Sequence, residues 1–458
     1  MSDNHYKITP ASAEGDVNHS PRRRVWQEKN LDADSRSLLT RDSNAFLHQS
    51  VSTPCLMAVK KVDGLWIEDV AGHRYMDFHG NNVHHIGHGH PKLIDAITRQ
   101  MQELPFAPRR YTCDVAVELA EKLASITPGE LSKVLFATGG SDAIEIAMKI
   151  ARISTGRFKT ISFWDSFHGA GFGASSIGGE QMFRTPIGPP LTGALHVPPF
   201  GDYRNAWGVT EGSADLCANQ IRYILEKEGD VGAVIAEPTR AVPYIAPAGF
   251  WQKVRDACHQ FGALLIFDEI PTGLGKTGKM FSCEHDQVVP DILVLGKALG
   301  GGVLPISSVI CHPGLDVTGQ FAIGHYTHEK NPVTARAALT TIEIIEQEGL
   351  VENAAEVGAQ ALSLLNDMQT HHPLIGDVRG RGMLFGIELV LDRDTREPAN
   401  EAADKVLYKA LDRGLSFKTT MGNVLTFTPP LITTAAQMGQ AMTIVGECIA
   451  EVERELGL

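Results

Sequence analysis

The segment that decides the fold is residues 264–302, LLIFDEIPTGLGKTGKMFSCEHDQVVPDILVLGKALGGG. It contains two short apolar runs, LLIF at 264–267 and ILVL at 292–295. Asp268 and Glu269 directly follow the first run, and Lys297 follows the second after a single glycine. Unbroken apolar runs of this length are typical of strands that are buried on both faces of a sheet. We therefore expect two buried strands that end in charged side chains.

Apolar runs of the same kind continue on both sides of this segment. We expect further strands at 133–138, 159–164, 232–238 and 306–311, and amphipathic helices at 91–104, 113–126, 141–154 and 249–262. Repeated strand–helix–strand units predict an α/β fold, in which helices cover both faces of a mostly parallel sheet.

The two ends of the chain differ from this central alternation. Residues 64–78, GLWIEDVAGHRYMDF, alternate apolar and polar side chains and predict two short strands around a turn. A long helix over 335–350 leads into a second α+β region. We therefore expect an N-terminal segment over 1–75 that joins the small domain, a large cofactor-binding domain over 76–335, and a C-terminal small domain over 336–458.

Composition limits the class of protein. The chain has 458 residues, 43% of them hydrophobic, which is enough for a large core. Its formal net charge of -13 disfavours nucleic acid and anionic membranes as partners. Seven scattered cysteines without a CxxC pair favour reduced thiols. We see no secretory signal and no stretch near the roughly 20 apolar residues of a membrane helix, so we expect a cytoplasmic protein.

Lys297 and Asp268 are the first candidates for chemistry. Ligands of open α/β sheets bind beyond the carboxyl ends of the strands, and Lys297 lies there among glycines that leave it accessible. An amine in this position can attack an aldehyde, although a surface lysine is by itself the more common explanation. Asp268 follows four apolar residues and is costly to bury unless it meets a cation, such as a pyridinium nitrogen. An aspartate that caps a turn is the alternative.

Two further segments complete a set of groups that one cofactor needs. FATGGSDAIEIAMKIAR (136–152) predicts a strand, a turn and a helix, so Gly140 and Ser141 would present backbone N–H groups to a phosphate. An ordinary helix cap gives a similar pattern. Phe167 and His168 follow another strand, where an aromatic ring can stack on a cofactor or simply pack in the core. Together, the amine, carboxylate, phosphate cradle and aromatic indicate a pyridoxal 5'-phosphate site.

Two motifs, DEIPTGLGKTGK (268–279) and PDILVLGKALGGG (290–302), carry a family resemblance. The chain resembles the class III (omega) aminotransferases, a group of fold-type I pyridoxal-phosphate enzymes, from about Trp66 to Leu431. The occurrence of the two motifs together and in this order is a specific signal of the family. The resemblance implies that Lys297 binds the cofactor as a Schiff base and that Asp268 pairs with its ring nitrogen. It also implies contacts to the ring from Ile270 and Phe167 and to the phosphate from Gly140 and Ser141.

The resemblance extends to the assembly and to the surroundings of the site. Thr327, in HYTHEKNP (325–332), is similar to a family threonine that reaches the phosphate of the neighbouring subunit. This implies a homodimer or homotetramer with sites at the subunit interface. Glu237, in AEP, resembles a glutamate near the active site, and we place His168 among the cofactor-binding residues as well.

Several positions depart from the family pattern. Pro271 stands where the family commonly has glutamine, Lys276 replaces an arginine, and Lys330 lies in a loop where many members have small residues. Thr426, in NVLTFTPPL (423–431), takes the place of an arginine that binds an α-carboxylate in other members. A substrate carboxylate would therefore lack its bidentate partner, which favours a terminal amine whose anionic group is held elsewhere.

The residues that hold this anionic group are less clearly marked. Arg24, Arg109, Lys330 and His84 are the candidates. Arg24 belongs to the run Arg22–Arg24, which is more often a solvated arm than an anion site. The histidines of NNVHHIGHGHP (81–91) lack the spacing of a metal site. We therefore expect no metal.

In GNNVHHIGHGHP (80–91), FAPRRYT (106–112) and GHYTHEKNP (324–332), the chain looks closest to a lyase branch of the family. That likeness implies elimination of ammonia from a hydroxylated aminophosphonate. The main alternative is an omega-aminotransferase that passes an amino group from a terminal amine to a 2-oxo acid. A nicotinamide-dependent dehydrogenase would need a G-x-G-x-x-G motif, which GGSDA does not supply. Lys297 and Asp268 disfavour a non-catalytic scaffold.

Overall fold

A seven-stranded sheet forms the centre of the protein, whose computed structural model describes residues 20–49, 52–201 and 203–458. The strand order is β4-β12-β11-β10-β7-β5-β6. The strands are β4 (Lys133–Ala137), β5 (Lys159–Phe163), β6 (Ala194–Val197), β7 (Val231–Ala236), β10 (Leu264–Asp268), β11 (Ile292–Leu295) and β12 (Ser307–Cys311). β12 pairs antiparallel with β4 and with β11, and every other neighbouring pair of strands is parallel. The expected α/β fold with a mostly parallel sheet is confirmed.

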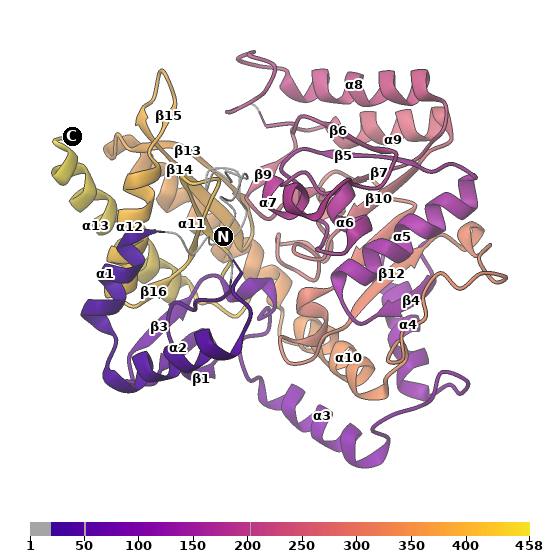
Figure 1. Ribbon diagram of the computed structural model, residues 1–458, viewed down its shortest axis with the longest axis horizontal. Coiled ribbons are helices and arrows are strands. Elements are labelled where there is room, and N and C mark those ends of the chain that lie inside the picture. Colours follow the sequence, from indigo (N-terminus) through magenta and orange to yellow (C-terminus); the bar gives the residue numbers. More distant parts are fainter. Residues whose placement is uncertain (1–19, 50–51, 202) are drawn as a thin grey trace.

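The helices cover this sheet on both faces (Figure 1). On one face α5 (Gly140–Thr155) packs against Ile266, Ile292 and Val294. On the other, α8 (Ser213–Glu228) and α9 (Phe250–Phe261) share a core with the alternate residues of the same strands, such as Leu265 and Phe267. Successive side chains of a strand point to opposite faces, so the unbroken apolar runs of β10 and β11 fill two separate cores.

The two ends of the chain meet beside the large sheet. β1 (Val59–Asp63), β2 (Trp66–Asp69) and β3 (Arg74–Asp77) form a sheet with β16 (Leu415–Ser416) from the C-terminal region. A further sheet holds β13 (Ile375–Arg381), β14 (Leu384–Asp392), β18 (Val424–Phe427) and β17 (Lys418–Thr420), with β15 (Glu397–Pro398) pairing to β14. The division into three parts at residues 75 and 335 stays a prediction.

The remaining helices surround these sheets. They are α1 (Pro21–Asn30), α2 (Ala33–Ala45), α3 (Pro91–Glu103), α4 (Asp114–Ile126), α6 (Phe172–Ile177), α7 (Gln181–Arg184), α10 (Pro332–Gln347), α11 (Leu350–His371), α12 (Asn400–Asp412) and α13 (Ala435–Leu456). In Figure 1, α1 lies beside α12 and α13. Among the described segments, no helix is both long enough and apolar enough to cross a membrane.

The structure corrects the interpretation of the arginine run as a solvated arm. Arg22 lies in the first turn of α1 and forms an ion pair with Glu401 over 2.7 Å. Arg23 is buried and donates a hydrogen bond to the carbonyl of Pro54 over 2.9 Å. The run therefore helps to attach the N-terminal helix to the rest of the protein.

Candidate active site

The carboxyl ends of the parallel strands bring the predicted cofactor residues to one edge of the large sheet. Asp268 ends β10, Lys297 follows β11, and Glu237 follows β7. The turn between β4 and α5 reaches the same edge, where a cavity of about 310 Å³ is lined by Gly139, Gly140 and Lys297 among others. This is the location where ligands bind in open α/β sheets.

Lys297 is held in an unusual backbone conformation. It begins a short 3-10 helix, Lys297–Gly300, and its φ of 42° lies in the left-handed region that few residues other than glycine adopt. A side chain at Gly296 would place its Cβ 2.7 Å from Ser307 Oγ, so only glycine fits before the lysine. Among the described residues, none forms a hydrogen bond or an ion pair with Lys297 Nζ. The amine is therefore available to a ligand in the cavity.

Asp268 is a buried carboxylate that a histidine orients. His168 Nδ1 lies 2.8 Å from Asp268 Oδ2, and both side chains are almost completely buried. The backbone N–H of Ile270 donates to the other carboxylate oxygen over 3.1 Å. Because a carboxylate accepts hydrogen bonds, Nδ1 carries the proton. This leaves His168 Nε2, a buried atom with no hydrogen-bond partner among the described residues.

The turn before α5 has the features of a phosphate cradle. Gly139 caps the helix without a side-chain hydrogen bond, so the first N–H groups of the helix keep their capacity for a ligand. Ser141 Oγ accepts a hydrogen bond from the N–H of Ala170 over 3.1 Å, which connects the turn to the loop after β5. A Cβ at Gly140 would lie 3.0 Å from Ile270 Cδ1, so Ile270 packs directly against the turn.

The remaining predicted cofactor residues lie around these groups. Phe167 is half-buried and its ring packs against Phe183, with centroids 4.6 Å apart. Glu237 is buried and accepts a hydrogen bond from the N–H of Ala241 over 3.2 Å. An available amine and an N–H-rich turn that line one cavity, with a buried carboxylate at the same sheet edge, fit pyridoxal 5'-phosphate.

The other predicted residues lie away from the strand ends, mostly at exposed positions. Thr327 is exposed, and Arg109 hydrogen-bonds His325 over 2.8 Å, so the loops around these residues touch. Lys330 is exposed in the second loop. Arg24 lies on the exposed face of α1 and forms an ion pair with Glu28 at 3.4 Å, so the structure does not bring it to the cavity.

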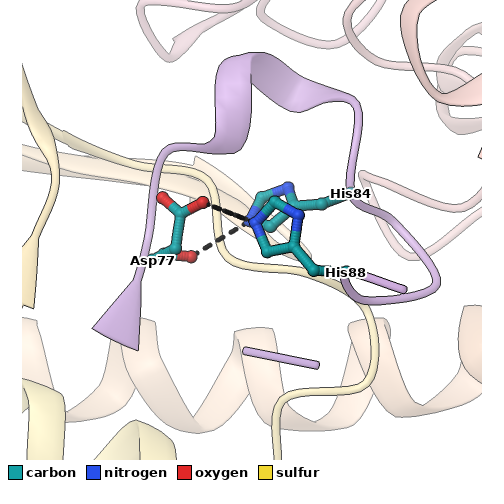
Figure 2. Close-up of side chains that lie close together, drawn as sticks. All are labelled: Asp77, His84 and His88. Atoms are coloured by element: carbon teal, nitrogen blue, oxygen red, sulfur yellow. Dashed lines mark hydrogen bonds and ion pairs between the residues drawn. The ribbon is translucent and has the colours of Figure 1, made fainter. Parts of the chain in front are cut away.

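His84 belongs to a separate cluster with Asp77 and His88 (Figure 2). His88 Nε2 lies 2.9 Å from Asp77 Oδ2, and His84 Nε2 lies 3.7 Å from the same oxygen and 3.0 Å from the carbonyl of Asp77. The other carboxylate oxygen accepts the N–H groups of His79 and Gly80. Three donor atoms within 4.8 Å could hold a metal ion, but these hydrogen bonds already explain the cluster as the anchor of a turn. The absence of a metal stays a prediction.

Two departures from the family pattern have clear positions. Lys276 is fully buried and donates to the carbonyl of Pro429 over 2.8 Å, and its burial lowers its pKa to about 7. Thr426 is also buried, and its hydroxyl lies 2.8 Å from that of Thr420. Thr426 therefore offers a neutral hydroxyl where other family members are expected to carry a cation.

Residues 48–449 match the sequence profile of the family described as Aminotransferase class-III. The chain belongs to the class III aminotransferase family. The match extends beyond the range over which the sequence motifs indicated the resemblance.

Members of this family with different activities are similar to the chain. The (R)-1-hydroxy-2-aminoethylphosphonate ammonia-lyase of Vibrio splendidus (strain 12B01) is 43% identical, over 97% of this chain and 96% of that protein. The isoleucine 2-epimerase of Lentilactobacillus buchneri is 36% identical, over 87% of this chain and 90% of that protein.

Solved structures of this family share the fold. The PLP-bound crystal structure of an amine transaminase from an uncultivated Pseudomonas species superposes with a TM-score of 0.84 at 29% identity, over 89% of this chain and 99% of that one. The fold is that of the fold-type I enzymes, and the cofactor of this class III aminotransferase family member is pyridoxal 5'-phosphate.

Sequence analysis did not single out two basic residues, one in β17 and one after β3. Lys418 is 6% exposed in β17, and His79 follows β3. Strand pairing places Lys418 opposite Thr426, and the hydroxyl of Thr428 donates to the carbonyl of His79, but no local motif marks either residue. A buried lysine in the short strand FKTT was the one available signal.

Proposed function

We propose that this class III family member is an ammonia-lyase that converts (R)-1-hydroxy-2-aminoethylphosphonate to phosphonoacetaldehyde and ammonia. The observation that carries the proposal is the 43% identity to the Vibrio splendidus enzyme of that name, over nearly the full length of both chains. Thr426, in place of the arginine that holds an α-carboxylate, supports it, because the proposed substrate has a phosphonate instead.

The residues at the sheet edge have complementary tasks in this reaction. When bound, pyridoxal phosphate supplies an aldehyde that condenses with the substrate amine and an electron sink for the adjacent carbon. Lys297 would hold the cofactor in the resting enzyme and then take the proton from that carbon. Asp268, oriented by His168 over 2.8 Å, would balance the positive charge of the ring nitrogen. Gly140 and Ser141 would donate N–H groups to the phosphate.

The elimination leaves a balanced reaction without a second substrate. Loss of the proton beside the nitrogen and of the neighbouring hydroxyl removes one water and produces an enamine. Addition of one water to the enamine then yields the aldehyde and ammonia. No 2-oxo acid is consumed, which separates this lyase from an aminotransferase.

The second candidate is an omega-aminotransferase. It is favoured by the family itself and by the amine transaminase whose structure superposes with a TM-score of 0.84. An aminotransferase needs the same cofactor residues, so the geometry of Lys297 and Asp268 does not separate the two activities.

The deciding experiment supplies the hydroxy-aminophosphonate to purified enzyme without any oxo acid. A lyase turns over many times per site and releases ammonia in step with aldehyde. An aminotransferase stops after one turnover, leaves its cofactor in the amine form and resumes when pyruvate is added. Arrest with rescue by pyruvate would overturn the lyase proposal in favour of the aminotransferase.

We also propose a cytoplasmic homodimer, or a homotetramer built from such dimers, with sites shared between subunits. The exposed Thr327 supports shared sites, since the resemblance directs it to the phosphate of a neighbouring subunit. All seven cysteines are free thiols, which suits a reducing compartment.

A further inference from the structure

Ser307, the first residue of β12, lies between two parts of the candidate cofactor site. Because β12 runs antiparallel to β4 and β11, it begins at the edge of the sheet where both of those strands end. Ser307 pairs with Ala137, which ends β4 just before the turn that starts α5. The next residue, Ser308, pairs with Leu295, which ends β11 shortly before Lys297. The strand order therefore places Ser307 between the phosphate cradle and Lys297.

The side chain of Ser307 points to the face of the sheet that α5 covers. Alternate residues of a strand point to the same face. Val309, two positions after Ser307, shares a core with Ile144 of α5, whereas Ile310 belongs to the core on the opposite face. Ser307 therefore points to the side of α5, and its neighbour Ser308 points away from it.

The hydroxyl of Ser307 lies against the residues that surround the cavity. A Cβ at Gly296 would lie 2.7 Å from Ser307 Oγ and 3.2 Å from Ile270 Cγ2, and Ile270 also packs against Gly140. Ser307 is only 1% exposed, and it lines the cavity of about 310 Å³ together with Gly140 and Lys297. A ligand in this cavity is therefore within reach of the Ser307 side chain.

The cavity offers few side chains that can bind an anion. Among the described residues of its lining, Lys297 is the one with a charge, and its amine is assigned to the aldehyde of the cofactor. The lining also includes the hydroxyls of Thr138 and Ser307, and Thr138 already donates to Asp142 Oδ2 over 2.7 Å. The hydroxyl of Ser307 forms no hydrogen bond with any described residue. Because a buried hydroxyl without a partner is costly, a ligand oxygen here would satisfy it.

We propose that Ser307 donates a hydrogen bond to the phosphate group of pyridoxal phosphate, beside the N–H groups of Gly140 and Ser141. This inference deepens the proposed cofactor site and rests on the assignment of the turn before α5 to the phosphate. The aldehyde and the phosphate arm stand on neighbouring carbons of the cofactor ring, which suits a residue between Lys297 and that turn. A hydrogen bond to an anionic oxygen is stronger than one between neutral groups. A parallel strand in place of β12 would begin at the opposite edge, so the antiparallel direction of β12 brings this donor to the site.

The test titrates the cofactor-free full-length protein with pyridoxal phosphate and with pyridoxal, which lacks the phosphate, and follows cofactor absorbance. In Ser307→Ala, the dissociation constant of pyridoxal phosphate should rise roughly tenfold or more, whereas that of pyridoxal should stay within about twofold of wild type. Ser308→Ala is the matched control, because Ser308 Oγ is equally buried and has no partner among the described residues, but lies on the opposite face. It should leave both dissociation constants unchanged.

Two results would overturn the role of Ser307. Unchanged affinity for pyridoxal phosphate in Ser307→Ala would exclude a contact with the cofactor, and equal losses for both ligands would exclude a contact with its phosphate. If Ser307→Ala does not fold, Ser307→Cys takes its place, because a thiol is a weak donor. If Gly140→Ala weakens cofactor binding and Ser307→Ala does not, the phosphate cradle stands and the inference about Ser307 alone fails. None of these outcomes depends on whether the enzyme is a lyase or an aminotransferase.

Discussion

Lys297 is the residue on which the chemistry depends. We expect Lys297→Ala to fold but to lose the covalent link to the cofactor, because Lys297 is the one lysine among the described residues that line the cavity. Borohydride reduction of the wild type, followed by peptide mapping, should locate the pyridoxyl group on Lys297. In the variant, the same treatment should leave the protein unmodified. A pyridoxyl group on another lysine of the wild-type chain would show that the assignment is wrong.

Asp268 gives a second prediction at the residue scale. Asp268→Asn keeps the shape of the side chain but removes the charge that His168 orients and that a ring nitrogen would meet. We expect kcat to fall by a factor equivalent to about 3–5 kcal/mol, with the cofactor still bound. Steady-state kinetics and cofactor absorbance measure the two effects. Asp316→Asn, which removes a carboxylate that pairs with the exposed Lys133, is the control. Turnover close to normal in Asp268→Asn would contradict the role.

From the sequence alone, residues next to the end of a strand can be identified, but the residues that contact them in the fold cannot. Asp268 is predicted because it directly follows an apolar run, and Lys297 because it follows one after a single glycine. The hydrogen bond between Asp268 and His168 joins residues 100 positions apart, and the approach of Lys418 to Thr426 depends on strand register. Neither follows from a local pattern, since both depend on how distant strands pair.

At the scale of elements, a substitution in the turn at the start of α5 should weaken cofactor binding more than a substitution at an ordinary helical position. Gly140→Ala places a Cβ 3.0 Å from Ile270 Cδ1, so Ile270 must move and the N–H groups become less accessible. We expect the cofactor dissociation constant to rise roughly tenfold, equivalent to about 1.4 kcal/mol. Titration of apoenzyme with pyridoxal phosphate measures the change.

Gly439→Ala, in a different helix, is the matched control for Gly140→Ala. Gly439 lies inside α13 with nothing within 4 Å of an added Cβ. This substitution should leave cofactor affinity unchanged and stabilise the folded protein by about 0.5–1 kcal/mol, because glycine is a poor helix former. If both variants bind the cofactor equally well, the turn before α5 does not form the phosphate cradle.

Most elements of the large sheet follow from the sequence, and the exceptions have physical causes. The strands at β4, β5, β7, β10, β11 and β12 coincide with apolar runs. β6, at the sheet edge, has the sequence ALHV, in which His196 interrupts the apolar residues and only Val197 is fully buried. Likewise, the attachment of α1 to α12 depends on ion pairs such as Arg22 with Glu401, which a basic run does not reveal.

At the scale of the whole molecule, buried and half-buried histidines should make the protein sensitive to acid. Burial lowers the pKa values of His84, His196 and His285 to about 4, from an ordinary 6.5. Below pH 6.5 these histidines bind protons in the unfolded chain but not in the folded protein. The free energy of unfolding therefore decreases as the pH falls from 6.5 toward 4. A fully buried histidine contributes up to about 1.4 kcal/mol per pH unit over this range.

Thermal unfolding of the holoenzyme at pH 7 and at pH 5 tests this expectation. The midpoint should fall at pH 5, and His196→Gln should reduce the difference between the two values. His196 stacks on Trp164, with ring centroids 4.5 Å apart. His371→Gln, at an exposed position on α11, should leave the difference unchanged. A pH dependence in His196→Gln equal to that of wild type would contradict the contribution of this residue.

Two subunits should complete each site through Thr327. Its hydroxyl is exposed in a loop that touches the segment of Arg109 through His325, so it can meet a second chain. We expect a dimer or larger oligomer in sedimentation at micromolar concentration. Lys297→Ala should be inactive alone and Thr327→Ala strongly impaired alone. Co-expression of the two variants should restore part of the activity, because a mixed dimer contains one site with both native residues. A fully active monomer, or mixed dimers no more active than the separate variants, would contradict shared sites.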